Sequence, residues 1–326
     1  MKTTDIHFKS IDMKSMISAA LLSLFLLGCS TRGTVEAPDG SRLAFLIDHL
    51  RDSLPATDYV MVAAHRGDWI WAPENSLKGI QNCIEIGVDI IEVDVRSTRD
   101  SVLVLLHDET LDRTTTGSGR VSEWSLNSLK RLRLLDATGV KTDQIIPTLG
   151  EVLDLAKGKA LLFLDKTQDK IPAVLDLVEQ KGMLNQAVFI LDLPYRQARK
   201  AFGNRLEKVF YFPVVGEGID SLDTYVNDFL THYKPAAFQF RIPGTGSPLL
   251  EYVSRVSASG AKPLVAATWA DHSMQRGDQA SRRDPEQGWG WLLSQGFTLL
   301  ETNHPYDLIE YLDKKGQRNL RLTADE

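Results

Sequence analysis

The chain has 326 residues, a formal net charge of -6 and 43% hydrophobic residues. This composition is that of a globular protein and excludes a disordered or fibrous chain. The mild acidity and the lack of a long Lys/Arg run argue against a nucleic-acid-binding protein, so no nucleic-acid partner is expected.

The N-terminal segment predicts export. Lys9 and Lys14 precede a short apolar run at residues 16–27, which is followed by a glycine and Cys29. A basic start, a short apolar stretch and a small residue at its end are typical of a signal peptide. The run is also shorter than the about 20 apolar residues of a membrane-spanning helix. We therefore expect residues 1–28 to be a signal peptide.

Cys29 is the expected lipidation site. The sequence LLGC that ends at Cys29 resembles a bacterial lipobox, in which the cysteine is acylated. An ordinary cleaved signal, or a start codon assigned too early, is the alternative. With a lipid on Cys29, residues 29–42 would be a tether, and the protein an exported lipoprotein anchored to a membrane of the bacterial cell envelope. Cys83 would then have no disulfide partner, and its helical surroundings predict a buried structural thiol.

The rest of the chain, residues 43–326, is expected to form one domain. A helix is predicted at 43–54, and apolar strand-like runs then alternate with amphipathic helical stretches. The predicted strands are 59–64, 89–95, 102–106, 160–164, 187–191, 209–215, 236–242, 263–268 and 298–302. The predicted helices include 76–86, 149–156, 171–181, 220–233 and 288–294.

This alternation predicts an α/β fold. Nearly continuous apolar strands indicate a parallel sheet covered on both faces, and eight or nine units indicate a (β/α)8 TIM barrel. A doubly wound open sheet is the competing architecture, but it would show a Gly-rich first turn, and the first turn here begins at His65-Arg66-Gly67. A polar stretch at about residues 109–146 interrupts the alternation of strands and helices. It predicts a small insertion after the second strand region, which could form one wall of a site.

Glu92 and Asp94 are the first candidates for chemistry. Residues two apart in a strand point to the same face, so both carboxylates would project into the barrel. Facing carboxylates repel unless a cation lies between them, and hard oxygen ligands suit Mg²⁺ or Ca²⁺. The alternative is that one carboxylate pairs with an arginine such as Arg66 or Arg96.

Two histidines follow apolar runs at the expected carboxyl ends of strands. His65 follows the run 59–64 and His107 follows the run 102–106. Imidazoles titrate near neutral pH, so a pair of them suits a reaction that needs a base and an acid. For either histidine alone, a structural hydrogen-bonded role is the alternative.

The set as a whole resembles a known family. His65-Arg66-Gly67, Pro73-Glu74-Asn75-Ser76, Glu92-Val93-Asp94, His107-Asp108 and Arg113-Thr114-Thr115-Thr116-Gly117 match, in order and spacing, the glycerophosphodiester phosphodiesterase family. Looser agreement extends from Tyr59 to about Leu312. The resemblance implies a (β/α)8 barrel that uses a divalent metal, Ca²⁺ or Mg²⁺, to hydrolyse glycerophosphodiesters to glycerol phosphate and an alcohol.

Roles for individual residues follow from the resemblance by matching position. Glu92 and Asp94 would hold the metal, His65 and His107 would be the acid/base pair, and Arg66 would contact the phosphate. In the family, a glycerol hydroxyl of the substrate is thought to attack first and give a cyclic phosphate that water then opens.

The third metal ligand departs from the family pattern. The family supplies it from a Glu-x-Lys pair, and if Lys166 is matched to that Lys, the Glu position is Leu164, which cannot bind metal. Asp165 is the nearest carboxylate, although a regular strand would turn it to the opposite face. Either Asp165 is the third ligand in a locally irregular strand, or water takes that place. Lys166 is expected near the phosphate in both cases.

Aromatic and basic residues near the expected site are candidates for headgroup recognition. Trp269, after the seventh predicted strand, is the expected pocket wall. Trp69 and Trp71 would either shape a pocket for a quaternary ammonium or only cover the barrel mouth. Arg241 would meet an acidic headgroup or a neighbouring carboxylate. The family also often has Asp where this chain has Asn303.

Two other functions remain as alternatives. The first is a lysophospholipase D or phosphoinositide-type phosphodiesterase on the same barrel, which would keep the catalytic residues and give a different product. The second is a non-catalytic lipid-anchored binding protein, for which the departure at Leu164 is the supporting feature. Both histidines, both carboxylates and Arg66 are present, which favours an enzyme.

Overall fold

The computed structural model describes residues 35–36, 41–51, 58–318 and 320–321. The expected signal peptide and Cys29 lie outside these residues. Within the expected tether, β1 (Val35–Glu36) pairs in parallel with β11 (Leu320–Arg321), and helix α1 (Arg42–Leu50) already begins at Arg42. None of the helices in the described part of the chain is long and apolar enough to cross a membrane.

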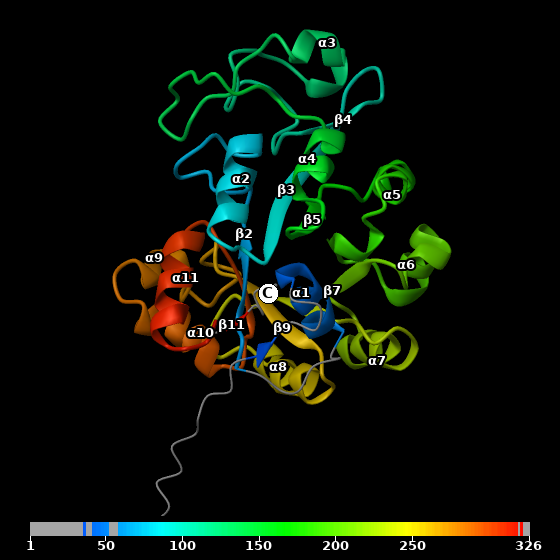
Figure 1. Ribbon diagram of the computed structural model, residues 1–326. Helices are drawn as coiled ribbons and strands as arrows, with labels where there is room; N and C mark the ends of the chain where they lie inside the picture. Colours follow the sequence, from blue (N-terminus) through cyan, green and yellow to red (C-terminus); the bar gives the residue numbers. More distant parts are fainter. Residues whose placement is uncertain (1–34, 37–40, 52–57, 319, 322–326) are drawn as a thin grey trace, which may run out of the picture. The chain divides into compact units, whose positions relative to one another are not determined.

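Eight parallel strands form a closed barrel (Figure 1). Around the barrel, β2 pairs with β3 on one side and with β10 on the other, which closes the sheet and confirms the predicted TIM barrel. The barrel strands are β2 (Met61–Ala64), β3 (Ile90–Ser97), β5 (Leu161–Asp165), β6 (Ala187–Leu191), β7 (Phe210–Gly216), β8 (Ala237–Arg241), β9 (Lys262–Ala266) and β10 (Leu299–Thr302).

Helices follow most of the barrel strands. They are α2 (Leu77–Glu85), α4 (Leu149–Ala156), α5 (Ile171–Gln180), α6 (Tyr195–Phe202), α7 (Leu222–His232), α8 (Leu249–Ala258), α9 (Asp278–Ser281), α10 (Trp291–Ser294) and α11 (Pro305–Lys314). Short 3-10 turns lie at Val121–Glu123, Leu184–Gln186 and Gly203–Arg205, and a π-helical turn at Glu286–Gly290 leads into α10. The starts of α1, α2 and α4 follow from their N-caps, because the side chains of Ser41, Ser76 and Thr148 accept a hydrogen bond from the first turn.

The two-residue period of the strands separates two apolar cores. On β5, Leu161 and Phe163 point into the barrel with interior residues of the other strands, whereas Leu162 and Leu164 pack outward against the helices. Cys83 is fully buried in the outer core, which agrees with the expected structural thiol. Apolar side chains fill the interior of the barrel. The polar groups lie above this layer, at the carboxyl end of the strands.

One predicted barrel strand was wrong. The run at residues 102–106 forms β4 (Leu103–Leu105), which pairs antiparallel with β3 and lies outside the barrel. Val95 faces Leu105 in this pair, and the backbone N–H of Leu106 donates to Asp94 O at 3.0 Å. His107 therefore reaches the carboxyl end of the barrel through a hairpin that returns the chain to β3.

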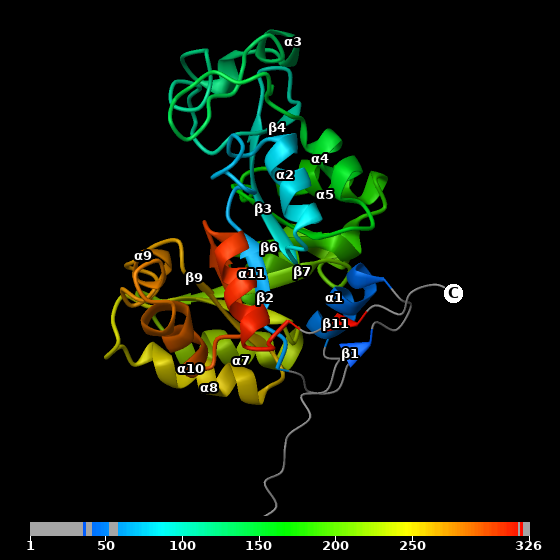
Figure 2. The ribbon, with the colours of Figure 1, turned by 60° about the vertical axis from the view of Figure 1, so that its left-hand side comes forward.

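The inserted segment after β4 has a small core of its own. Val104 and Leu106 pack there with Leu111, Val121, Leu129, Leu134 and Ile146. The segment includes α3 (Leu126–Leu129), and Figure 2 shows it extending from the barrel, away from the grouped elements α1, β1 and β11.

A buried network of ion pairs connects helix α1 and the segment after α11 to the barrel. Asp89, just before β3, is fully buried and forms ion pairs with Arg42 of α1 and with Arg318, which follows α11. The Tyr59 hydroxyl donates to the same carboxylate at 2.8 Å and the Val62 N–H at 2.7 Å. Although burial opposes ionisation, Arg318 and Arg42 lower the pKa of Asp89. The carboxylate is therefore charged in the folded protein, and it connects α1 and the segment after α11 to the barrel.

Replacing Asp89 by Ala is expected to lower the free energy of unfolding by about 3–5 kcal/mol, because the buried Arg318 guanidinium would lose its counter-charge. Chemical denaturation at pH 7 measures this loss. Asp154→Ala is the matched control: Asp154 forms an exposed pair with Lys181, and its removal should cost less than about 1 kcal/mol. Equal losses in the two variants would contradict the structural role given to Asp89.

Candidate active site

Six polar side chains gather where the barrel strands end. His65 and Arg66 follow β2, Glu92 and Asp94 lie near the end of β3, Asp165 ends β5 and Asn303 follows β10. The interior positions alternate along each strand, so these side chains lie above the apolar interior layer. This is the end at which TIM barrels hold their active sites.

Glu92, Asp94 and Asp165 form a carboxylate cluster in which Glu92 and Asp94 are buried and Asp165 is partly exposed. One oxygen of each lies within 4.8 Å of the others, and Asp94 is in register with Asp165 on the neighbouring strand. Burial, then the charges of Asp94 and Asp165, raise the pKa of Glu92 well above its usual range. Burial also raises the pKa of Asp94 and outweighs the opposing charge of His107. The cluster is therefore unfavourable without a compensating positive charge.

The hydrogen bonds around this cluster fit a cation. The backbone N–H of Arg66 donates to Glu92 Oε2 at 2.6 Å, but Glu92 Oε1 is buried and has no hydrogen-bond partner among the described residues. The Asn75 side chain donates to Asp94 Oδ2 at 2.8 Å and accepts from the Asp94 N–H at 2.9 Å, which fixes that carboxylate. Three oriented carboxylates with an unused buried oxygen are a ligand set for Ca²⁺ or Mg²⁺.

Asp165 faces the barrel interior without an irregular strand. The expectation that it would turn away was wrong, because Leu164 is the residue that packs outward with the helices. Lys166 follows with a positive φ of 54°, and this turn brings its Nζ to 3.8 Å from Asp94 and 3.9 Å from Asp165. Asp165 therefore supplies the carboxylate that the Glu-x-Lys pattern lacks here, with Lys166 beside it.

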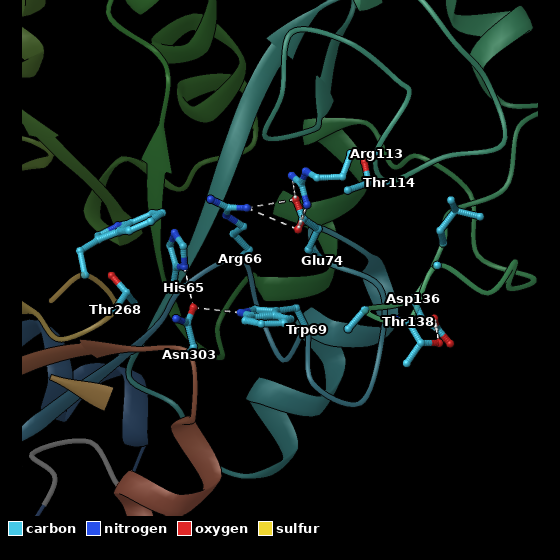
Figure 3. Close-up of a pocket in the computed structure, with 14 residues that line it drawn as sticks. His65, Arg66, Trp69, Glu74, Arg113, Thr114, Asp136, Thr138, Thr268 and Asn303 are labelled. Carbon is cyan, nitrogen blue, oxygen red and sulfur yellow. Dashed lines mark hydrogen bonds and ion pairs between the residues drawn. The ribbon is translucent and has the colours of Figure 1, made fainter. Parts of the chain in front are cut away.

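His65 is held in one orientation by Asn303. His65 Nδ1 lies 2.8 Å from Asn303 Oδ1, and Trp69 Nε1 donates to the same oxygen at 3.0 Å (Figure 3). An indole nitrogen can only donate, so the Asn303 atom that it faces is the carbonyl oxygen, and His65 Nδ1 must carry a proton. Burial, followed by the Arg66 charge, lowers the pKa of His65 to about 4. His65 Nε2 is thus the basic nitrogen of a neutral ring.

His107 has a charged partner instead. Its Nδ1 lies 2.6 Å from Asp108 Oδ1, and Arg113 donates to both oxygens of Asp108 at 2.8 and 3.0 Å. Arg113 also binds Glu74 at 2.7 and 2.8 Å, and Glu74 accepts from Arg66 at 3.3 Å. The side-chain hydrogen bond from Arg113 leads the contributions that lower the pKa of Asp108, which is therefore an anion beside the ring. Asp108 therefore fixes the orientation of the His107 ring.

The turn after β2 is conformationally demanding. Arg66 has a φ of 58° and Gly67 a φ of 74°, and a Cβ on Gly67 would approach the Gly79 backbone to 3.3 Å. A left-handed conformation costs a residue with a side chain roughly 1–2 kcal/mol. The turn directs the Arg66 N–H to Glu92 and leaves the Arg66 side chain between Glu74 and Asp94.

Part of this site lines a cavity of about 480 Å³ (Figure 3). The carboxylate cluster and His107 are not among its lining residues. His65, Arg66 and Trp69 form one side, and residues 135–139 of the inserted segment form another. Trp269 lies across from them, with its ring edge-on to His65 at 6.0 Å between centroids. Trp71 is 79% exposed and does not line this cavity, and Arg241 ends β8 outside it. The predicted Trp269 and Trp69 are thus both wall residues.

Two residues of the site were missed or undervalued in the sequence. Asn303 was noted only as a departure from the Asp that the family often has there, yet it accepts hydrogen bonds from both His65 and Trp69. Glu301 was not considered at all, although one oxygen of it lies within 4.8 Å of ligand atoms of His65 and Glu92. The signal that could have found Glu301 is a carboxylate in the otherwise apolar run that begins at Phe297.

Comparison with known proteins agrees with this geometry. Residues 65–206 match the glycerophosphoryl diester phosphodiesterase family, and residues 211–312 match a domain of unknown function. A glycerophosphodiester phosphodiesterase of Caldanaerobacter subterraneus is 44% identical over 103 residues, which cover 31% of this chain and 42% of that protein. Glycerophosphodiester phosphodiesterase 1 of Mus musculus is 36% identical over 116 residues, which cover 34% of this chain and 35% of that protein. The chain therefore spans less than half the length of either relative.

Solved structures share the fold over most of the chain. A glycerophosphoryl diester phosphodiesterase from Parabacteroides distasonis has a TM-score of 0.69 at 23% identity, covering 84% of this chain and 93% of that one. A phosphodiesterase from Oleispira antarctica, solved in complex with the product sn-glycerol-3-phosphate, has a TM-score of 0.60 at 22% identity and covers 81% and 99%.

In the chelated protein, His65 is expected to be a neutral ring with its proton on Nδ1 from pH 8 down to about pH 5, because its pKa is lowered to about 4. Long-range ¹H–¹⁵N NMR of the histidine side chains measures both the tautomer and the titration. Asn303→Ala should remove the tautomer preference, whereas Asn227→Ala, at an exposed Asn that binds Arg255, should not. A proton on Nε2, or titration near pH 6.5, would contradict the role of Asn303.

Proposed function

We propose that the protein belongs to the glycerophosphoryl diester phosphodiesterase family, which residues 65–206 match. It would be a metal-dependent phosphoric diester hydrolase that cleaves glycerophosphodiesters to glycerol phosphate and an alcohol. The observation that carries the proposal is the carboxylate cluster of Glu92, Asp94 and Asp165, with His65 next to Glu92. His107 is connected to Glu74 through Asp108 and Arg113. The glycerol phosphate complex of the Oleispira antarctica neighbour supports the substrate class.

The cation ligands in this proposal are Glu92, Asp94 and Asp165. A bound Ca²⁺ or Mg²⁺ would neutralise part of the phosphate charge, which otherwise repels an attacking oxygen. Arg66 and Lys166 would add positive charge next to the cluster, since their side chains lie 3.8 Å from Asp94 on different sides of its carboxylate. Arg66 presents a planar fork that suits two phosphate oxygens.

His65 is the base in the proposed reaction. Its neutral ring keeps Nε2 free to take a proton, because Asn303 accepts the Nδ1–H. In the first step, a glycerol hydroxyl of the substrate gives its proton to Nε2 while its oxygen forms a bond to phosphorus. The phosphorus–oxygen bond to the leaving alcohol breaks, and a five-membered cyclic phosphate results. Water then opens this ring in a second step.

His107 is the acid in the proposed first step. Asp108 lies 2.6 Å from Nδ1 and orients the ring, so that a proton on Nε2 can pass to the leaving alkoxide. In the second step His107 takes a proton from the attacking water and His65 returns one to the glycerol oxygen. In this proposal, His65 has a neutral amide as its partner and acts as the base. His107 has a carboxylate as its partner and acts as the acid.

The cellular location of the protein is also part of the proposal. Cys29 at the end of a signal-like segment supports export and a lipid anchor in the cell envelope, with the barrel acting outside the cytoplasm. Scavenging of glycerophosphodiesters from membrane debris would suit that location.

Chelation is expected to abolish glycerol phosphate release from glycerophosphocholine, and added Ca²⁺ or Mg²⁺ should restore it. His65→Ala and His107→Ala should each lower kcat by roughly 10²–10⁴-fold, because each removes a proton-transfer group. His304→Ala, at a partly buried histidine 3.9 Å from Asp307, is the matched control and should keep activity. Release of a cyclic lipid phosphate from lysophospholipid would instead favour the lysophospholipase reading. Inactivity of the folded, metal-loaded protein on several headgroups would favour the binding protein.

The division of roles has a separate test. With a p-nitrophenyl ester of glycerol phosphate, the leaving group needs no proton, so His107→Ala should keep most of the wild-type rate of the first step while His65→Ala loses it. Burst-phase release of p-nitrophenol measures this step. Equal losses in both variants would contradict the division, and inversion at phosphorus with direct water attack would contradict the cyclic intermediate.

A further inference from the structure

Glu301 is a buried carboxylate that the proposed mechanism does not use. It lies on β10 and is 5% exposed, in register with Ala63 of β2 and Ala266 of β9. A small side chain on each neighbouring strand leaves room beside the Glu301 carboxylate at this level of the barrel. Below it, Leu299 belongs to the apolar interior, so Glu301 is the first charged residue that β10 contributes.

The contacts of Glu301 within the described chain do not account for its charge. Gln239 Nε2 lies 3.5 Å from Glu301 Oε2, which is at the limit of a hydrogen bond. No ion pair with Glu301 occurs among the residues that the structure describes. A buried carboxylate without a strong partner is costly, so its retention needs another explanation.

Glu301 lies close to Glu92, which is also a member of the proposed cation cluster. Ligand atoms of His65, Glu92 and Glu301 all lie within 4.8 Å of one another, and Glu92 also belongs to the cluster with Asp94 and Asp165. The buried Glu92 Oε1, which has no hydrogen-bond partner there, is an independent sign of a missing ligand at this point. Ligands on opposite sides of a Ca²⁺ ion, at 2.3–2.6 Å each, stand about 5 Å apart, so carboxylates at these separations can share one ion.

We propose that Glu301 is a fourth carboxylate ligand of the divalent cation, added to Glu92, Asp94 and Asp165. The inference rests on the proposed metal site and extends it to a residue on a strand at the other side of β2. Asp165 has a shorter side chain than the glutamate of the Glu-x-Lys pattern, and Glu301 provides further negative charge to the same site from β10. A cation bound by four carboxylates keeps fewer water ligands than a cation bound by three.

This role has two opposite consequences for one substitution. Without a cation, a Glu301 carboxylate oxygen lies within 4.8 Å of a Glu92 oxygen in the barrel interior, where two like charges repel. Glu301→Gln should therefore raise the melting temperature of the chelated protein. The same substitution should weaken cation binding by about tenfold or more, since even groups behind the ligands contribute 10–100-fold to metal affinity. A merely structural glutamate would not combine these two effects.

The test is a calorimetric titration of the chelated full chain with Ca²⁺ and with Mg²⁺, beside thermal unfolding with and without each ion. Glu301→Gln and Glu301→Leu both remove the charge, and circular dichroism checks that each is folded. Glu310→Gln, at an exposed glutamate paired with Lys314, is the matched control. Weaker cation binding and a smaller cation-induced rise in melting temperature in both Glu301 variants, with the control unchanged, is the expected result.

Glu92→Gln separates a failure of the proposed metal site from a failure of Glu301 as a ligand. If it weakens cation binding and both Glu301 variants bind as wild type does, Glu301 is no ligand, and the proposed metal site stands without it. If the wild-type protein binds neither ion, both the site and this inference are overturned.

Discussion

Like-charge repulsion inside the barrel is the constraint on which the site depends. Ligand atoms of Glu92 lie within 4.8 Å of those of Asp94 and Asp165 in one group and of those of His65 and Glu301 in another, where burial already disfavours ionisation of Glu92 and Glu301. Asn75 holds Asp94 and the Arg66 backbone holds Glu92, while the side chains of Arg66 and Lys166 lie 3.8 Å from Asp94 and offset part of the negative charge. The left-handed backbone at Arg66, Asn75 and Lys166 shows that the chain accepts local strain to make these contacts. The proposed divalent cation would offset the repulsion, and its binding would stabilise both the fold and the bound substrate.

The two histidines differ because their partners differ. Asn303 accepts hydrogen bonds from His65 and Trp69, and its backbone N–H donates to Asp278 Oδ2 at 2.7 Å, so an uncharged amide fixes the His65 ring. His107 belongs to a charged chain that runs through Asp108, Arg113 and Glu74 to Arg66. The two histidines thus have an amide as partner in one case and a carboxylate in the other. Arg66 lies between the two chains and couples them to the carboxylates.

Much of this site follows from the sequence, because strand periodicity and strand ends are local properties. The apolar runs predicted the barrel, and the two-residue spacing placed Glu92 and Asp94 on one face. The run at 102–106 has the same apolar character as a barrel strand, so its antiparallel pairing with β3 could not be seen before the structure. The inward direction of Asp165 depends on register with β3, and the roles of Asn303 and Glu301 depend on contacts between β10 and β2, far apart in the chain. The lipid anchor at Cys29 stays a prediction.

A crystal structure of the protein grown with Mn²⁺ and glycerol 3-phosphate would test the central claim most directly, since the anomalous signal of Mn²⁺ locates the cation without assumption. The account predicts one strong peak within bonding distance of Glu92 and Asp94, with the phosphate of the product beside Arg66 and in reach of His65 Nε2. A peak elsewhere with the carboxylate cluster still empty, or a phosphate bound away from both histidines, would contradict it.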